Sequence, residues 1–243
     1  MVEFRIAPEI GEHYPDLFVN LIVVRALDSR PDAAACERIV AYARSCEEQL
    51  RVEFPSKEAL ALDPRVQAYF EMFRTFGSNP KRMKPSHFAL ADRVIRGGEL
   101  PDISPPVNLY NALSVRHLVP FGGEDLDTVA DFFELGYATG EELWTPIGGT
   151  EPQSTRRGDV VWRDGLEVST TSLNHRQCDK TKLTSKSRNV YFLSEGFRGV
   201  NDRHIDTMSA EFIAVFGDFL GGTYERFILT RESPTVRLSG VTS

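Results

Sequence analysis

The chain has 243 residues, of which 41% are hydrophobic and 26% charged, and this ordinary balance excludes disordered and fibrous classes of protein. No apolar run approaches the roughly 18 residues needed to span a bilayer, and the N-terminus lacks the apolar core of a signal peptide. The net charge of -7 argues against a general affinity for polyanions such as DNA. Three cysteines without a CxxC pair predict neither a disulfide framework nor a cysteine zinc site, and they fit a reducing cytoplasm.

The first part of the chain predicts a buried strand followed by three helices. The apolar, β-branched segment 17–27 is typical of a buried strand. Apolar residues then recur at helical spacing in three segments, which are 32–54, 63–77 and 85–98. Asp32 and Ser86 are the expected N-caps of the first and third helices, Pro64 begins the second, and Gly97 ends the third.

The second part of the chain predicts mainly strands. Asp164-Gly165 is a strong hairpin signal between two strand-like segments, 158–164 and 166–173. A mixed segment at 128–139, a strand at 189–197, a helix at 207–222 and a final strand at 224–230 complete the series. Helices first and strands later favour an α+β fold. We therefore expect one domain over 1–243, with a helical half at about 30–100 and a strand-rich half at about 105–235. Neither a dinucleotide-binding nor a P-loop glycine motif is present.

Two polar clusters could carry chemistry. The first contains Asn111 and Ser114, followed by Gly122-Gly123, whose backbone could approach a ligand or simply turn the chain. The alternative for this cluster is an ordinary helix start with its cap. The second cluster is the run Asn174, His175, Arg176, Gln177, Cys178. His175 and Cys178 are a poor base and nucleophile, because strand residues three apart point to opposite faces. The histidines have no metal-binding spacing, so we expect no metal.

Two basic segments stand out in this acidic chain. The first contains Lys81, Arg82 and Lys84, and the second contains Lys180, Lys182, Lys186 and Arg188. Local positive charge of this kind is what a contact with a phosphate backbone requires. A solvated charged face explains the two segments nearly as well.

The order of motifs resembles the B3/B4 tRNA-binding domain, which is the editing module of the bacterial phenylalanyl-tRNA synthetase β-chain, and in particular free-standing proteins made of that domain. The resemblance covers about residues 10 to 230 and rests on three motifs, which are KPSHFALADRVIRGG, LYNALSVRHLVPFGGEDLD and RQCDKTKLT. It implies an α+β fold with β/β/α layers and a pocket of amino-acid size. It also implies hydrolysis of a mischarged aminoacyl-tRNA by a positioned water, without a metal or a cofactor.

The resemblance also places residues at that pocket. Asn111 matches an asparagine that lines it, whereas Gly122 stands where the synthetase has a histidine that helps editing. In the synthetase, a glutamate binds the hydroxyl group of a wrongly attached tyrosine. By the resemblance, this glutamate aligns with Leu193, or with Glu195 after a small shift. We expect Asn111, Asn174 and His175 as catalytic candidates. The expected substrate-binding residues are Asn111, Ser114, Gly122, Gly123, Asn174, Arg176, Gln177 and Glu195, with Asn111, Asn174, Arg176 and Gln177 meeting in one cavity.

The expected partners are tRNA or aminoacyl-tRNA and an amino-acid-sized ligand, and neither DNA nor a membrane. Lys81, Arg82, Lys84, Lys180, Lys182, Lys186 and Arg188 are the expected RNA contacts. Three functions stay open at this point. The first is a trans-acting aminoacyl-tRNA deacylase, the second a tRNA-binding module without catalysis, and the third an aminoacyl-tRNA-dependent acyl transferase.

Overall fold

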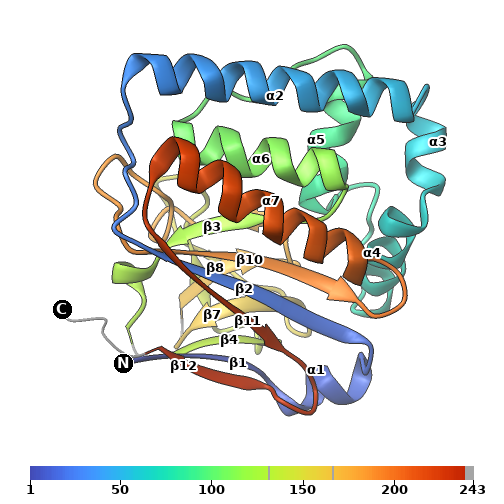
Figure 1. Cartoon of the computed structure of the whole chain (residues 1–243). Helices are drawn as coiled ribbons and strands as arrows, with labels where there is room; N and C mark the ends of the chain where they lie inside the picture. The colour runs from blue at the N-terminus through green and yellow to red at the C-terminus, as the bar shows by residue number, and fades with distance from the viewer. Residues whose placement is uncertain (131, 166, 239–243) are drawn as a thin grey trace.

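A computed structural model describes residues 1–130, 132–165 and 167–238 and arranges their strands in two sheets (Figure 1). The larger sheet consists, in spatial order, of β12 (Thr235–Leu238), β1 (Val2–Ile6), β4 (Phe132–Tyr137), β7 (Val160–Asp164), β8 (Glu167–Thr171), β5 (Leu143–Trp144) and β6 (Gln153–Ser154), and β9 (Arg176–Gln177) pairs with β8. The smaller sheet consists of β11 (Thr223–Leu229), β2 (Leu17–Arg25), β10 (Val190–Phe197) and β3 (Gly122–Asp125).

The helices are α1 (Pro8–His13), α2 (Ala33–Glu53), α3 (Lys57–Leu62), α4 (Pro64–Thr75), α5 (Ser86–Ile95), α6 (Pro105–His117) and α7 (Asp202–Leu220), and a 3-10 turn covers Leu126–Thr128. Asp32 accepts a hydrogen bond from the Ala35 amide and so caps α2 as predicted. The predicted cap of α5 is wrong, because Ser86 is the first helical residue and Pro85 occupies the cap position without a side-chain bond. Within the described ranges, no helix has the length and apolar character needed to cross a membrane.

The molecule is layered, which confirms the β/β/α prediction. In Figure 1, α2 lies on α6 and α7, these two helices lie on the smaller sheet, and the larger sheet packs beneath it. The alternation of side chains along β2 explains why both faces of the smaller sheet are buried. Leu17, Leu21 and Val23 join the cluster between the two sheets, whereas Ile22 and Val24 join the cluster beneath the helices.

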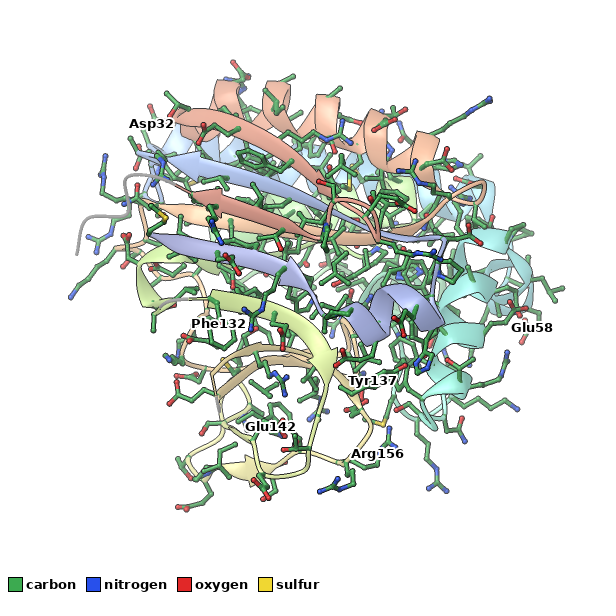
Figure 2. The ribbon with its side chains drawn as sticks, turned by 90° about the horizontal axis from the view of Figure 1, so that it is seen from below. Asp32, Glu58, Phe132, Tyr137, Glu142 and Arg156 are labelled. Atoms are coloured by element: carbon green, nitrogen blue, oxygen red, sulfur yellow. The ribbon has the colours of Figure 1, made fainter. Side chains whose placement is uncertain are left out.

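The larger sheet has a more polar outer face. Seen from below in Figure 2, it carries no long helix in the described part of the chain, and Phe132, Tyr137 and Glu142 lie along it. Arg163 joins Glu134 and Glu142 through contacts of 2.7 and 2.9 Å, so the buried acids of this region are neutralised within the protein.

Several predicted elements need correction. The strand β1 was not predicted; it precedes β2 and pairs in parallel with the distant β4. The segment 128–139 contains β4, helix α7 begins five residues before its predicted start, and β12 follows the strand predicted to be last. The strand at 17–27, the three helices and the hairpin at Asp164-Gly165 are confirmed.

Candidate functional site

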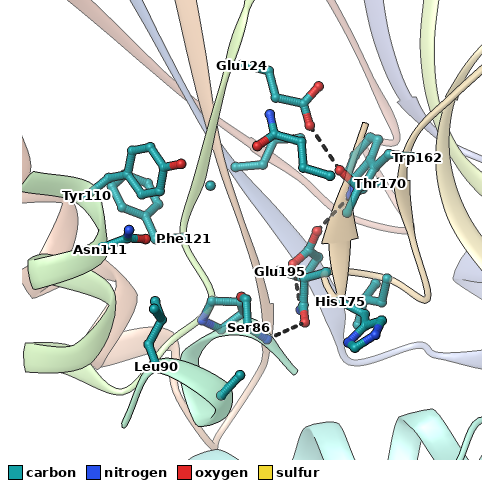
Figure 3. A pocket seen from close by; sticks show the side chains of 17 residues that line it. Ser86, Leu90, Tyr110, Asn111, Phe121, Glu124, Trp162, Thr170, His175 and Glu195 are labelled. Atoms are coloured by element: carbon teal, nitrogen blue, oxygen red, sulfur yellow. Dashed lines mark hydrogen bonds between the residues drawn. The ribbon is translucent and has the colours of Figure 1, made fainter. Parts of the chain in front are cut away.

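A cavity of about 280 Å³ lies where the two sheets meet α5 and α6 (Figure 3). Its wall is partly apolar, and its polar residues come from helices, strands and one loop. The lining residues are Ser86, Ala89, Leu90, Tyr110, Asn111, Pro120, Phe121, Gly122, Glu124, Trp162, Thr170, Leu173, Asn174, His175, Gln177, Leu193 and Glu195. A small concave site with a few convergent polar groups is the usual form of a ligand pocket.

One wall comes from α6, which runs beneath α2. Asn111 is 7% exposed and faces the cavity, and within the described chain its side-chain amide has no hydrogen-bond partner. Tyr110 stands beside it, and burial raises the pKa of its phenol to well above the usual value. Figure 3 shows both residues opposite Glu195 and His175. The α6 wall therefore offers an unused amide to whatever fills the cavity.

Two buried glutamates stand on the smaller sheet. Glu195 on β10 is 3% exposed and accepts hydrogen bonds from Trp162 Nε1 at 2.7 Å and Asn174 Nδ2 at 3.1 Å. Glu124 on β3 is 5% exposed and accepts from Thr170 Oγ1 at 3.0 Å and from Tyr191. Burial raises the pKa of both carboxyls, and the hydrogen bonds to each offset part of that rise.

The third wall is the short loop after β8. Ser172 and Leu173 have φ of 46° and 62°, a left-handed turn that brings the following residues back over the cavity. His175 then places Nδ1 2.8 Å from the Lys84 carbonyl oxygen. A carbonyl only accepts, so Nδ1 carries the proton and Nε2 is the basic nitrogen. Burial lowers the pKa of His175, although its bond to Lys84 opposes this, so the ring is neutral at pH 7.

The structure brings together most of the predicted pocket residues and separates three others. Asn111, Asn174, His175, Gln177, Gly122 and Glu195 all line the cavity, and their roles there stay predictions. Arg176 does not line it, contrary to expectation, because Gln177 faces the cavity and adjacent strand residues point to opposite sides. Ser114 is also absent from the wall, since its hydroxyl donates to the Val119 carbonyl at the end of α6.

Gly123 is the third separated residue, and it supports the wall from behind. Its carbonyl accepts a hydrogen bond from Gln177 Nε2 at 3.1 Å, and the edge of the Phe192 ring fills the space where a side chain would begin. Of the two glycines expected to bind substrate, only Gly122 lines the cavity, and it has open space at its Cβ position. Glu124 also lines the cavity, but it was not among the residues predicted from the sequence.

Cys178 has the environment of a structural cysteine. It is 3% exposed, does not line the cavity, and lies 3.4 Å from the Thr181 hydroxyl. Burial raises the pKa of its thiol, so the thiolate needed for nucleophilic attack is disfavoured at neutral pH. In the residues that the structure describes, no group of three or more His, Cys, Asp and Glu side chains is placed to hold a metal ion.

The two basic segments contain some cations that form salt bridges and others that form none with the described residues. Lys84 pairs with Asp92, Lys180 with Glu167, and Lys182 with Asp179, so these three charges are partly neutralised within the protein. Lys81, Arg82, Lys186 and Arg188 are exposed and form no salt bridge with the described residues. The last two border a shallow surface depression together with Arg30 and Ser185. These four cations are therefore the better candidates for contact with a polyanion.

Comparison with known proteins gives the family. Among solved structures, the chain is similar to an N-terminal fragment of the phenylalanyl-tRNA synthetase β-subunit from Pyrococcus horikoshii, with a TM-score of 0.48 and 11% identity over 93% of this chain and 54% of that one. The chain thus spans about half the length of that fragment. Comparison with curated proteins gave no match. The B3/4 domain model matches residues 68–210, more than half of the chain and the whole of the cavity wall. The chain therefore belongs to the B3/4 domain family.

Proposed function

We propose that the chain binds aminoacyl-tRNA and hydrolyses its ester bond as a trans-acting deacylase, without a metal or a cofactor. The observation that carries the proposal is a cavity lined by both His175, whose basic nitrogen is Nε2, and the unpartnered Asn111. Family membership supports tRNA as the carrier of the acyl group. The volume of about 280 Å³ suits an aminoacyl group rather than a nucleotide.

The charge of the cavity supports an ester rather than a free amino acid. Its lining contains two glutamates and neither lysine nor arginine. A free carboxylate or a phosphate would have to enter beside buried acids without a fixed cation, which is unfavourable. In aminoacyl-tRNA the carboxylate is consumed in the ester, and the α-amine carries the charge. The acyl group therefore fits the cavity, and the phosphates stay outside, near the exposed cations.

Hydrolysis requires a base and a donor for the developing oxyanion. His175 Nε2 takes a proton from a water, whose oxygen attacks the ester carbonyl carbon. The Asn111 amide donates to the oxygen on which negative charge develops. When the carbon–oxygen bond to the ribose breaks, the imidazolium returns its proton to the ribose oxygen. The Lys84 carbonyl holds the ring in the required tautomer throughout.

A binding module without catalysis is the second candidate. The observation that favours it is that both oxygens of Glu195 already accept hydrogen bonds from the protein, so Glu195 is poorly placed to activate water. An acyl transferase would use the same cavity but would require an amine acceptor. Incubation with labelled aminoacyl-tRNAs separates the three functions, because the ester is lost, is protected, or is lost only when an acceptor is present.

The deacylase proposal predicts a specific effect of one substitution. His175→Gln should lower the rate of ester loss by roughly 100-fold or more, the range for removal of a general base. The exposed His204→Gln is the matched control and should keep the parent rate. The pKa of His175 is lowered from 6.5, so the base stays neutral at pH 7 and the rate should fall only below pH 6.5. An unchanged rate in His175→Gln, with the fold intact, would exclude this mechanism.

A further inference from the structure

The buried acids of this protein follow a pairing rule with two exceptions. Seven acidic side chains are buried in the described chain: Glu47, Asp92, Glu124, Glu134, Glu142, Asp159 and Glu195. Five of them form salt bridges: Glu47 with Arg44, Asp92 with Lys84, Glu134 and Glu142 with Arg163, and Asp159 with Arg156. Burial of an acid without a cation is costly, so this pairing is expected.

The two exceptions are Glu124 and Glu195, and both line the same cavity. Neither has a salt bridge with any residue that the structure describes. Their recorded side-chain partners are all neutral donors: Trp162 and Asn174 for Glu195, and the hydroxyls of Thr170, Tyr191, Thr181 and Ser169 for Glu124. A carboxylate has about four acceptor positions on its two oxygens. Burial raises the pKa of both carboxyls, and a cation placed beside either one would favour its ionised form.

The two carboxylates stand at separate positions along the cavity. Glu124 is paired in register with Tyr191, and Glu195 lies four residues further along β10 on the same face. At about 3.4 Å per residue, the two backbone positions are about 14 Å apart along the strand. The side chains reach inward from these positions, and the two carboxyls still interact, because the charge of Glu124 helps to raise the pKa of Glu195. Two cationic groups on one ligand would offset this repulsion.

A second feature of the wall points to a bound molecule. Asn111 is 7% exposed, lines the cavity, and has no side-chain hydrogen bond within the described chain. Its amide atoms stay accessible from the cavity, so they can pair with a molecule that binds there. Its free donor and acceptor lie across the cavity from Glu195 in Figure 3. The wall thus offers an unpaired amide and two carboxyl groups that lack a cation.

We propose that this cavity selects a dicationic acyl group, an aminoacyl ester whose side chain ends in an ammonium or guanidinium. One glutamate binds the α-ammonium and the other binds the cation at the end of the side chain. The inference rests on the proposed function in taking the ligand as an aminoacyl ester. An apolar or aromatic side chain would leave one buried carboxylate without a cation, and this is the basis of selection.

Carboxyl-capped amino acids test the charge selection without tRNA. Calorimetry of the whole chain at pH 7 would compare L-lysinamide with L-norleucinamide, which has the same four side-chain carbons but lacks the terminal ammonium, and with L-tyrosinamide. We expect L-lysinamide to bind at least tenfold more tightly than either. Equal or tighter binding of L-norleucinamide or L-tyrosinamide would overturn the inference. This comparison uses the unmodified chain, so it decides the matter even if a variant fails to fold.

Variants then locate the effect. Glu124→Gln and Glu195→Gln keep the side-chain shape and remove the charge, and each should weaken L-lysinamide binding by tenfold or more. Glu48→Gln, on the exposed face of α2, is the matched control and should bind like the parent. Parent-like binding by both folded cavity variants would place the ligand elsewhere and overturn the inference.

The two proposals fail in different ways. If L-lysinamide binds with the expected selectivity but every labelled aminoacyl-tRNA keeps its ester, the cationic site stands and the deacylase is wrong. If the chain hydrolyses an aminoacyl-tRNA with an uncharged side chain at least as fast as lysyl- and arginyl-tRNA, the deacylase stands and the dicationic substrate is wrong.

Discussion

His87 should make the protein sensitive to acid. It is fully buried on α5, its ring lies 4.6 Å from that of Tyr69, and neither ring nitrogen has a hydrogen-bond partner among the described residues. Burial lowers the pKa of His87 from 6.5 to about 3. The neighbouring Ser86 lines the cavity, whereas His87 points into the core.

The sign of the effect follows from the lowered pKa. Between pH 6.5 and 3 the unfolded chain binds a proton at His87 and the folded chain does not, so the free energy of unfolding falls as the pH falls. The shift of 3.5 pKa units, from 6.5 to about 3, corresponds to about 5 kcal/mol in total. Between pH 7 and 4.5, about 2.7 kcal/mol of this would be lost.

His87→Phe tests this quantity. Phenylalanine keeps an aromatic ring against Tyr69 and cannot titrate, although its larger volume could cost about 1–3 kcal/mol through overpacking. That packing cost is the same at both pH values, so it cancels when the stability difference at pH 7 is subtracted from that at pH 4.5. Urea unfolding at the two pH values should show the variant gaining about 2.7 kcal/mol relative to the parent on acidification.

The matched control is Phe88→Leu in the same helix. Phe88 is buried and packs against Phe70, but it does not titrate, so its stability difference should be equal at the two pH values. If His87→Phe also gave equal differences at pH 7 and 4.5, His87 would be protonated in the folded chain as readily as in the unfolded one. The reasoning from burial would then be wrong.

Two further predictions concern the cavity wall and the basic segments. A Cβ at Gly123 would lie 2.4 Å from Phe192 Cε1, so Gly123→Ala should lower the free energy of unfolding by about 1–3 kcal/mol, whereas Gly122→Ala, with open space at its Cβ, should match the parent in urea unfolding. The reverse order of stability would contradict this. Lys186→Glu and Arg188→Glu should weaken tRNA binding and flatten its salt dependence by roughly one unit for each lost phosphate contact, and Arg203→Glu on α7 should not. Unchanged binding and salt slope would leave Lys186 and Arg188 as a solvated face.

Local signals in the sequence predicted individual helices, strands and turns, but they did not predict how the strands pair in the sheets. The cap at Asp32, the proline at Pro64 and the Asp164-Gly165 turn each define structure within a few residues, and each is confirmed. The strand β1 alternates apolar and polar residues and could have been found from that pattern. Its parallel pairing with β4, about 130 residues away, depends on packing of the whole chain and has no local signal.

The same limit applies to the site, because long-range packing decides which residues line the cavity. The resemblance led to Asn111, Asn174 and Glu195, and all three line the cavity. The prediction that Arg176 lines the cavity was wrong. The side of the sheet on which this residue lies depends on the register of β9 against β8, and a shift of one residue moves every side chain to the other face. Glu124 was missed because a glutamate in a glycine-rich turn gives no sign of burial. Tyr191, which packs between the sheets, donates a hydrogen bond to Glu124.

The buried acids fall into two groups. Those with a salt bridge stabilise the fold, whereas the two without one are available to a ligand. Glu47 accepts from the Leu100 amide and pairs with Arg44 and Arg51, so it joins α2 to the segment after α5. Glu142 binds the amides of its own turn and pairs with Arg163. Glu124 and Glu195 neutralise no cation of the described chain, although their burial costs stability. Buried groups without a partner occur mainly at functional sites, because there a bound molecule compensates for the missing interaction. A cation in the cavity would supply it and would stabilise the folded chain in proportion to its occupancy.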